Sequence, residues 1–411
     1  MIIRRFISTT AHRASVPQSI TMQDVELNKD SYTNVTPKIL SYLDKKLHLQ
    51  QNHPICMMKD RILHFMHNKF VNTRGNAIFS MHDNLNPIVT VRQNFDSLLV
   101  PHDHPSRTKT DCYYINESLM LRAHMTAHQA ELIQMGLDNF LMVGDVYRRD
   151  KINSTHYPVF HQMDAVRLQL PLEGLIVKEK KPTERTSEKQ EIYTLDATKV
   201  VEKELKGTLE GLMREIFGEK VEFKWVDAYF PFTHPSWELE ILVNGEWMEM
   251  LGCGVMEHEI LDNAGCGDRI GWAFGLGLER LAMTYYSIPD IRVFWSNDSG
   301  FHSQFKNKTF MDRFAYKPFS IFPQCPLDLS FWVKGEFCPN DFHDLAREVI
   351  GDIVEQVDMI DHFINTKTGK ESYCFRIVYR SMFKTLTKKE AVLQHSRLAK
   401  KLTEKYDVII R

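Results

Sequence analysis

Two glutamates are predicted to face each other in the clearest strand pattern of the chain. Residues 237–251 form two strand-like runs around Asn244-Gly245, a pair typical of a two-residue hairpin turn. This turn places Glu240 directly opposite Glu249, and like charges in such a pair destabilise a sheet. A divalent cation that bridges the phosphates of ATP is one candidate for removing the repulsion. The alternative is that both carboxylates face water.

A second candidate lies where a predicted strand passes through glycines into a helix. Residues 275–280 (GLGLER) allow close backbone approach at Gly275 and Gly277 and place Arg280 on the helix. A guanidinium is permanently charged and binds phosphate in a bidentate manner. The third glycine of a dinucleotide-binding fingerprint is missing. Taken alone, Arg280 is equally compatible with an ordinary surface arginine.

A strand–loop–strand pattern over residues 140–170 supplies the third set. Arg148 and Arg149 lie where the first strand meets the loop. Gln162 and Asp164 share one face of the returning strand because side chains alternate along a strand. An arginine for an anion and a Gln/Asp pair for an ammonium group would suit an amino acid zwitterion. Each residue singly is also compatible with an ordinary polar strand position.

Taken together, these segments resemble the phenylalanine–tRNA ligases, which are class II aminoacyl-tRNA synthetases. The resemblance extends from about residue 37 to residue 411 and is greatest to the monomeric organellar form. The segments similar to motif 2 are GDVYRRD (144–150) and HYPVFHQMDAVR (156–167), and the segment similar to motif 3 is GWAFGLGLERLAM (271–283). Further similar segments are RAHMTAHQ (122–129), FPFTHPS (230–236) and LGCGVME (251–257).

The resemblance implies a site for phenylalanine and for ATP with magnesium. Arg148 would hold the α-phosphate and the substrate carboxylate, and Arg280 would hold the distal phosphates. The residues implied around the ammonium end of the amino acid and along the same strand are His124, Thr126, Gln162, Met163, Asp164 and Ala165.

The same resemblance assigns the ring and nucleotide contacts. The substrate ring would pack on Phe230 and Phe232 with Ala273 at the bottom of the pocket, and Phe274 would lie near the adenine. Glu249 would face the ATP–magnesium side, and we include Glu240 in the metal site because of the cross-strand pairing. Substrate contacts are also implied within a charged stretch, at Arg185, Gln190 and Glu191.

Two positions depart from the family pattern. Asp164 stands where the family usually has glutamate, and Thr126 stands where it usually has serine. Both keep the functional group, but the aspartate is one methylene shorter. This leaves open whether the ammonium contact is direct or runs through a water molecule.

The expected fold class is α+β, with two folded domains. A class II antiparallel-sheet catalytic domain is predicted over residues 37–300, and a linker over 301–322. Residues 323–411 show the order strand, helix, strand, strand, helix, strand, which predicts a ferredoxin-like anticodon-binding domain. Residues 1–20 are rich in arginine and hydroxyl groups and lack acidic residues, which is typical of a mitochondrial transit peptide.

Several local predictions complete the pattern. We expect a strand within residues 86–100 and a helix over 117–136 that ends at Gly136. Residues 177–191 are charged and nearly free of apolar side chains, which indicates a solvated loop. Residues 376–411 contain ten Lys/Arg and three Asp/Glu, which favours RNA binding by that part of the chain.

Composition limits the alternatives. The 411 residues have a formal net charge of −2, and the seven scattered cysteines form no CxxC pair. We therefore expect neither a disulfide framework nor a zinc site, and no membrane segment. The expected partners are tRNA(Phe), phenylalanine and ATP, and the expected protein is a monomer of the mitochondrial matrix. The rival interpretations are a ligase of the same fold for another acid and a catalytically inactive RNA-binding paralogue.

Overall fold

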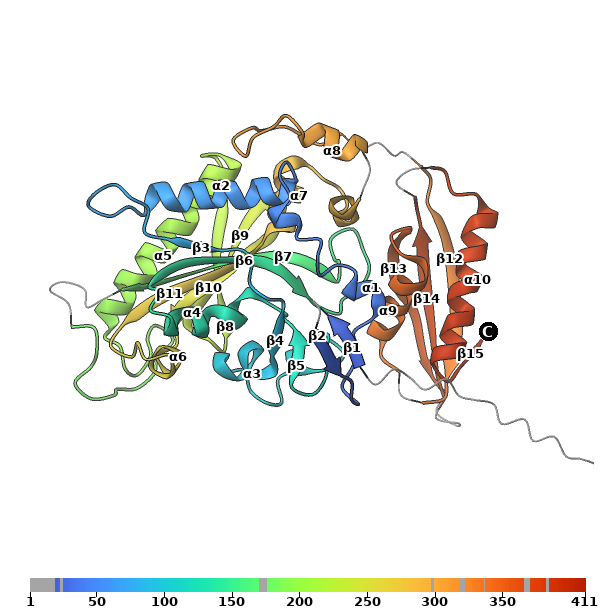
Figure 1. Ribbon diagram of the computed structural model, residues 1–411, viewed down its shortest axis with the longest axis horizontal. Coiled ribbons are helices and arrows are strands. Elements are labelled where there is room, and N and C mark those ends of the chain that lie inside the picture. The colour runs from blue at the N-terminus through green and yellow to red at the C-terminus, as the bar shows by residue number, and fades with distance from the viewer. Residues whose placement is uncertain are drawn as a thin grey trace, which may run out of the picture.

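Two units lie side by side, a larger one built on a mixed sheet and a smaller C-terminal one (Figure 1). This computed structural model describes residues 19–22, 25–169, 176–296, 299–317, 322–335, 337–365, 370–381 and 384–411. Apart from Ser19 and Ile20, the expected targeting segment lies outside these ranges. Within them, no helix is both long and apolar enough to cross a bilayer.

The larger unit has a sheet of seven described strands in the order β3-β6-β7-β11-β10-β9-β8. The predicted antiparallel sheet is confirmed for all neighbouring pairs except β3–β6, which is parallel. The strand bounds are β3 Ser80–His82, β6 Asn139–Tyr147, β7 Val159–Gln169, β8 Phe223–Phe230, β9 Thr233–Val243, β10 Glu246–Met256 and β11 Ile270–Gly277. The predicted hairpin is confirmed, with Asn244 and Gly245 in the left-handed conformation and Glu240 directly opposite Glu249.

Three helices cover one face of this sheet and bury its main core. They are α2 Pro54–Lys69, α5 Leu195–Phe217 and α7 Leu278–Tyr286. Pro54 begins α2, because the backbone N–H groups of the first helical turn have no partner within the helix and proline lacks this group. Thr194 caps α5 by accepting a hydrogen bond from the N–H of Ala197. The other face of the sheet is left for shorter elements and the cavity described below.

These shorter elements correct two local predictions. Only Ile88–Thr90 (β4) is a strand within 86–100, because Thr90 and Gln93 form a capping box that begins α3, Val91–Asn94. The predicted helix over 117–136 is instead β5, Leu119–Leu121, followed by a 3₁₀ turn and α4, Gln129–Gln134. Its predicted end is confirmed, with Gly136 at φ +85°. The remaining short elements are β1 Ser19–Met22, β2 Val25–Asn28, α1 Pro37–Leu40, α6 His258–Asn263 and α8 Ser299–Phe305.

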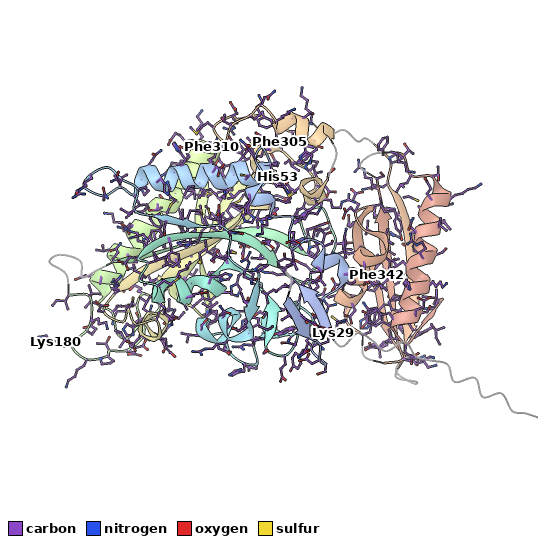
Figure 2. The ribbon with its side chains drawn as sticks, in the orientation of Figure 1. Lys29, His53, Lys180, Phe305, Phe310 and Phe342 are labelled. Atoms are coloured by element: carbon purple, nitrogen blue, oxygen red, sulfur yellow. The ribbon has the colours of Figure 1, made fainter. Side chains whose placement is uncertain are left out.

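The smaller unit has the predicted ferredoxin-like order of elements. It comprises β12 Cys325–Val333, α9 Pro339–Ile350, β13 Val354–Ile364, β14 Glu371–Tyr379, α10 Lys388–Lys405 and β15 Val408–Ile410. The sheet order is β13-β14-β12-β15, and a separate apolar core lies beneath its two helices. Phe342 on α9 belongs to this core, whereas His53 at the beginning of α2 lies in the larger unit (Figure 2).

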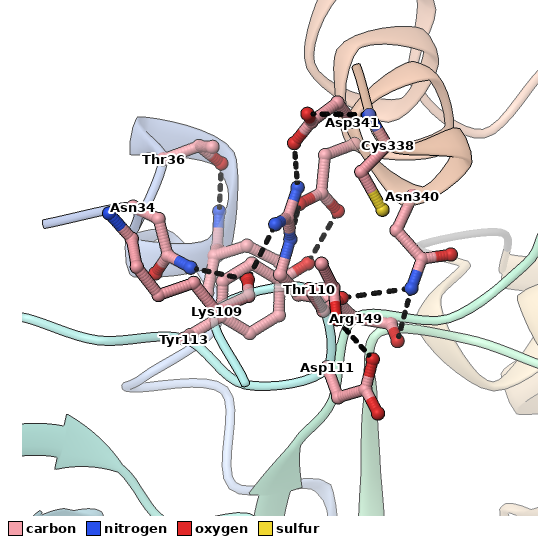
Figure 3. A network of polar contacts seen from close by, with 12 residues as sticks. Asn34, Thr36, Lys109, Thr110, Asp111, Tyr113, Arg149, Cys338, Asn340 and Asp341 are labelled. Atoms are coloured by element: carbon pink, nitrogen blue, oxygen red, sulfur yellow. Dashed lines mark hydrogen bonds and ion pairs between the residues drawn. The ribbon is translucent and has the colours of Figure 1, made fainter. Parts of the chain in front are cut away.

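A polar network fixes α9 against the larger unit (Figure 3). Arg149, just beyond β6, forms ion pairs with Asp341 at 2.7 Å and with Asp344 at 2.5 Å. Asn340 donates a hydrogen bond to the carbonyl of Thr110 at 2.8 Å. The side chains of Arg149 and Asp344 are both buried, and each has a second charged partner, Asp341 for the arginine and Arg347 for the aspartate.

Candidate functional site

A cavity of about 660 Å³ lies over β7, β10 and β11 on the face of the sheet not covered by α2, α5 and α7, and the ends of β8 and β9 also line it. It brings together most of the residues predicted from the sequence. Those that line it are His124, Thr126, Arg148, Gln162, Asp164, Ala165, Phe230, Phe232, Glu249, Ala273 and Phe274. The cavity has a polar, charged end and an apolar end. It therefore suits a ligand that carries both a charged group and an apolar group.

A buried carboxylate and an amide form the polar end. Asp164 is 5% exposed and accepts a hydrogen bond of 2.6 Å from the hydroxyl of Thr126. Burial raises the pKa of Asp164 to about 7, while the Thr126 hydrogen bond and the charge of Arg148 act in the opposite direction. Gln162 lies on the same face of β7, and its buried Oε1 has no partner among the described residues. An unpaired amide oxygen beside a carboxylate is suited to receive an ammonium group.

The backbone of β11 approaches this polar end closely. Gly275 lies opposite Asp164 across β11 and β7. A Cβ added at Gly275 would stand 2.8 Å from Oδ1 of Asp164, so a larger residue would have to displace the carboxylate. The predicted close approach is therefore confirmed at Gly275. At Gly277 a Cβ would meet no atom within 4 Å.

Arg148 provides the positive charge of the cavity. Its Nε donates a 2.8 Å hydrogen bond to the carbonyl of Ala123, and its guanidinium lies 5.3 Å from the ring centroid of Phe160. Within the described part of the chain, its two terminal nitrogens donate no hydrogen bond. Burial lowers the pKa of Arg148, and nearby acidic groups partly offset this effect. A held guanidinium with free terminal N–H groups is a preorganised anion site.

His124 is neutral beside this arginine. Burial lowers the pKa of His124 to about 3, and the charge of Arg148 acts in the same direction. Its Nδ1 is buried and has no partner among the described side chains and backbone. The imidazole can therefore exchange one hydrogen bond with a ligand without adding a second positive charge.

Aromatic side chains form the apolar end. Phe230 and Phe232 stack with ring centroids 5.8 Å apart and an interplanar angle of 12°. A Cβ at Gly252 would stand 2.7 Å from Cζ of Phe230, so this glycine on β10 makes room for the ring. Ala273 pairs with Val166 across β11 and β7 and adds a small apolar side chain to the wall. The surface left between them suits a planar apolar group.

Each of the two facing glutamates forms an ion pair with a different basic side chain. Glu249 lines the cavity and forms an ion pair of 3.4 Å with Arg280, which also donates to the Glu249 carbonyl at 2.7 Å. Glu240 does not line the cavity, and its carboxylate forms an ion pair of 2.8 Å with Lys224. Burial, together with the charges of Glu249 and Glu240, raises the pKa of the neighbouring Glu238. Excess negative charge therefore remains at this edge of the cavity.

Six predicted residues do not line the cavity: Glu240 and Arg280, whose ion pairs are given above, and four others. Met163 points into the main core on the opposite face of β7. Gln190 is buried, donates to the carbonyls of His234 and Met256, and accepts from the N–H of His258. The other two are paired close by, Arg185 with Glu257 and with Glu191. The hydrogen bonds of Gln190 and the Arg185–Glu257 ion pair fasten the charged stretch of residues 177–191 to the rest of the larger unit.

Sequence reasoning missed two buried pairs that support the site. His161 Nδ1 lies 2.7 Å from Oε1 of Glu279, and the other oxygen of Glu279 accepts from the His161 N–H at 2.8 Å. This pair joins β7 to α7, the helix of Arg280. Arg122 forms a buried ion pair of 2.8 Å with Asp145 on β6. Both pairs lie within or beside the motif segments, but their partners are distant in sequence and no local spacing indicates them.

Two further cavity residues were also missed. Gln129 begins α4 and is 1% exposed, and Asn340 reaches the cavity from α9 of the smaller unit. Gln129 falls within the segment RAHMTAHQ, so its place in that motif was the available signal. Nothing in the sequence near Asn340 indicates a contact with another domain.

Family models match both units. The model for "tRNA synthetases class II core domain (F)" matches residues 40–177 and 189–305, and the "Ferredoxin-fold anticodon binding domain" model matches residues 320–411. A probable mitochondrial phenylalanine–tRNA ligase of Drosophila melanogaster is 50% identical over 99% of this chain and 96% of its own length. The mitochondrial enzyme of Mus musculus is 49% identical over 88% and 82%, and that of Saccharomyces cerevisiae is 35% identical over the whole of both chains.

Proposed function

The chain belongs to the mitochondrial phenylalanine–tRNA ligases of class II, and from this premise we propose how its own residues act. The reaction begins with ATP-dependent activation of L-phenylalanine to the aminoacyl-adenylate. The phenylalanyl group then passes to tRNA(Phe) for mitochondrial translation. The proposed location is the mitochondrial matrix, where the protein acts as a monomer.

The observation that supports this proposal is the division of one cavity into a zwitterion end and a ring end. Asp164, Gln162 and Thr126 offer acceptors for an ammonium group, and Arg148 offers donors for a carboxylate. The stacked phenylalanines offer an apolar slot for the substrate ring. An amino acid with an aromatic side chain satisfies both ends at the same time.

In the first step a carboxylate oxygen of phenylalanine attacks the α-phosphorus of ATP. The bond to the bridging oxygen of the β-phosphate breaks, and pyrophosphate leaves with the electron pair. In this step Arg148 holds the phenylalanine carboxylate and the α-phosphate together and stabilises the charge that develops there. No covalent enzyme intermediate is needed.

ATP is proposed to enter with its magnesium as one substrate. Glu249 faces the cavity, and the raised pKa of Glu238 indicates negative charge that a cation would relieve. Glu249 would therefore hold the magnesium, which would neutralise phosphate charge. Arg280 would exchange Glu249 for the distal phosphates, and Phe274 would lie against the adenine.

In the second step a hydroxyl of the terminal ribose of tRNA attacks the acyl carbon, and AMP leaves. The proposed tRNA contact is α10, which presents exposed Lys388 and Lys389 at its beginning. Further along, Arg397, Lys400 and Lys401 line a groove between α10 and α9. Binding through such lysines and arginines should weaken steeply as salt increases.

Pyrophosphate exchange into ATP tests the proposal. The full-length protein should catalyse exchange when phenylalanine is added and much less with leucine, because leucine leaves the ring slot unfilled. A protein that supports no exchange with phenylalanine, but binds tRNA, would instead be an inactive RNA-binding paralogue. Exchange that prefers a non-aromatic acid would assign the cavity to another ligase reaction.

A further inference from the structure

One buried carboxylate joins β7 to α7 by accepting two hydrogen bonds from a single residue. Oε2 of Glu279 accepts from the backbone N–H of His161 at 2.8 Å, and Oε1 lies 2.7 Å from Nδ1 of the same histidine. Because a carboxylate oxygen accepts, Nδ1 carries the proton of this contact. The side chains of the histidine and the glutamate are 0% and 4% exposed. The proposed reaction uses neither residue.

This contact lies where the pairing of two strands ends. The ladder between β11 and β7 reaches Gly277 opposite Gln162, and the chain of β11 then continues as α7. His161 is the next residue along β7, and its counterpart Leu278 already belongs to the helix. The carboxylate of Glu279 therefore supplies the acceptor that one more strand residue would have supplied.

The same contact restrains the first turn of α7. The helix begins after Gly277, which offers no side chain as a cap. The ring of His161 is itself held, because it packs against His48 and Trp295 with centroid distances of 5.2 and 5.8 Å. The strand that carries it lies between β6 and β11. His161 is thus a fixed point to which Glu279 fastens the beginning of the helix.

Arg280 follows Glu279 directly in the sequence and is less firmly held. Its side chain is 45% exposed, and it contacts Glu249 through an ion pair of 3.4 Å and a hydrogen bond of 2.7 Å to the carbonyl. An exposed ion pair of this kind restrains a long side chain only weakly. The position of the guanidinium therefore depends on the helical turn that carries it.

We propose that Glu279 is a positioning residue, which together with His161 holds α7 so that Arg280 meets the distal phosphates of ATP. This proposal rests on the proposed function of the cavity. Glu279 does not line the cavity and acts through Arg280. Loss of the contact should weaken the binding of ATP. It should leave the binding of phenylalanine nearly unchanged, because Gln162 and Asp164 lie on β7, which β6 and β11 continue to hold.

A pair of variants in the full-length protein separates the contact from the size of the side chain. Glu279→Met keeps the length of the side chain and removes both hydrogen bonds, whereas Glu279→Gln keeps a carbonyl that can accept from the His161 N–H. In pyrophosphate exchange, Glu279→Met should raise KM for ATP about tenfold, and Glu279→Gln should raise it less. KM for phenylalanine should change less than about threefold in both.

A double-mutant cycle shows whether the effect passes through the arginine. In an Arg280→Ala background, Glu279→Met should raise KM for ATP by less than a further factor of about two, because the route to the phosphates is already lost. Thr208→Val is a matched control, since it removes a buried hydrogen bond to the carbonyl of Glu204 within α5. It should change neither KM value.

Two results would overturn the proposal. One is an increase in KM for ATP that is equally large with and without Arg280, which would leave Glu279 with a general structural role. The other is a KM for ATP that Glu279→Met changes no more than it changes KM for phenylalanine. If Glu279→Met does not fold, His161→Leu compared with His161→Asn allows the same cycle, because asparagine alone keeps a side-chain N–H for Glu279. A wild-type protein without phenylalanine-dependent exchange would refute the proposed function instead, and calorimetric titration of the same variants with ATP and magnesium would then test Glu279.

Discussion

Asp164 should make capture of phenylalanine depend on pH near neutrality. Its carboxyl group must be ionised to attract the substrate ammonium, and its pKa is raised by burial to about 7. With this pKa, about 9% of the protein carries an ionised Asp164 at pH 6 and about 91% at pH 8. The value of kcat/KM for phenylalanine in pyrophosphate exchange should therefore rise about tenfold between these pH values.

Asp164→Asn should remove that rise. The amide keeps the size of the side chain and can still accept from Thr126, but it cannot ionise. Losing a charge-assisted hydrogen bond should lower kcat/KM at pH 8 by about 10- to 100-fold, mainly through KM for phenylalanine. Asp268→Asn is a matched control, because the Asp268 side chain is 71% exposed and does not line the cavity. Parallel pH profiles for wild type and Asp164→Asn would refute the assignment.

The same shift predicts a stability effect of defined sign. The folded-state pKa of about 7 lies above the ordinary value of 3.8, so the folded protein favours the protonated carboxyl. The contribution of Asp164 to the free energy of unfolding is fully present below pH 3.8 and is lost as pH rises through 7. At pH 8 the ionised, buried group costs about 4 kcal/mol. Asp164→Asn should therefore have a higher unfolding midpoint than wild type at pH 8, and the gap should close at low pH.

Further predictions concern the other parts of the site. Arg148→Ala should lower pyrophosphate exchange about 10²–10³-fold without changing the circular dichroism spectrum, and wild-type exchange would remove the arginine from the mechanism. Glu249→Gln should increase the magnesium concentration needed for half-maximal exchange more than it increases KM for phenylalanine, and superimposable magnesium titrations would contradict this. Ala273→Gly should admit para-substituted phenylalanines more readily, measured by their kcat/KM relative to phenylalanine. Lys388→Glu with Lys389→Glu should weaken tRNA charging at physiological salt and spare exchange, whereas unchanged charging would place the RNA contact elsewhere.

Sequence alone determined the features that depend on short-range periodicity. The Asn244-Gly245 turn fixes the hairpin register, so the opposition of Glu240 and Glu249 follows from counting residues. Alternation along β7 places Gln162 and Asp164 on one face in the same way. The order of elements in residues 323–411 likewise identifies a ferredoxin-like sheet, because each element carries its own apolar pattern.

Tertiary structure decided what each polar side chain meets. Nothing local in the sequence indicates that Arg149 pairs with Asp344 across the two units. Nor does it indicate that the side-chain amide of Gln190 hydrogen-bonds to distant backbone carbonyls. The prediction of a long helix before Gly136 failed because packing over β6 and β7 outweighs the local helical pattern, and only α4 remains helical. Gln129 illustrates the same limit: its type is read from the sequence, but its burial beside the cavity exists only once distant segments enclose it. Periodicity specifies which face a side chain takes, whereas burial and pairing depend on residues far away in the chain.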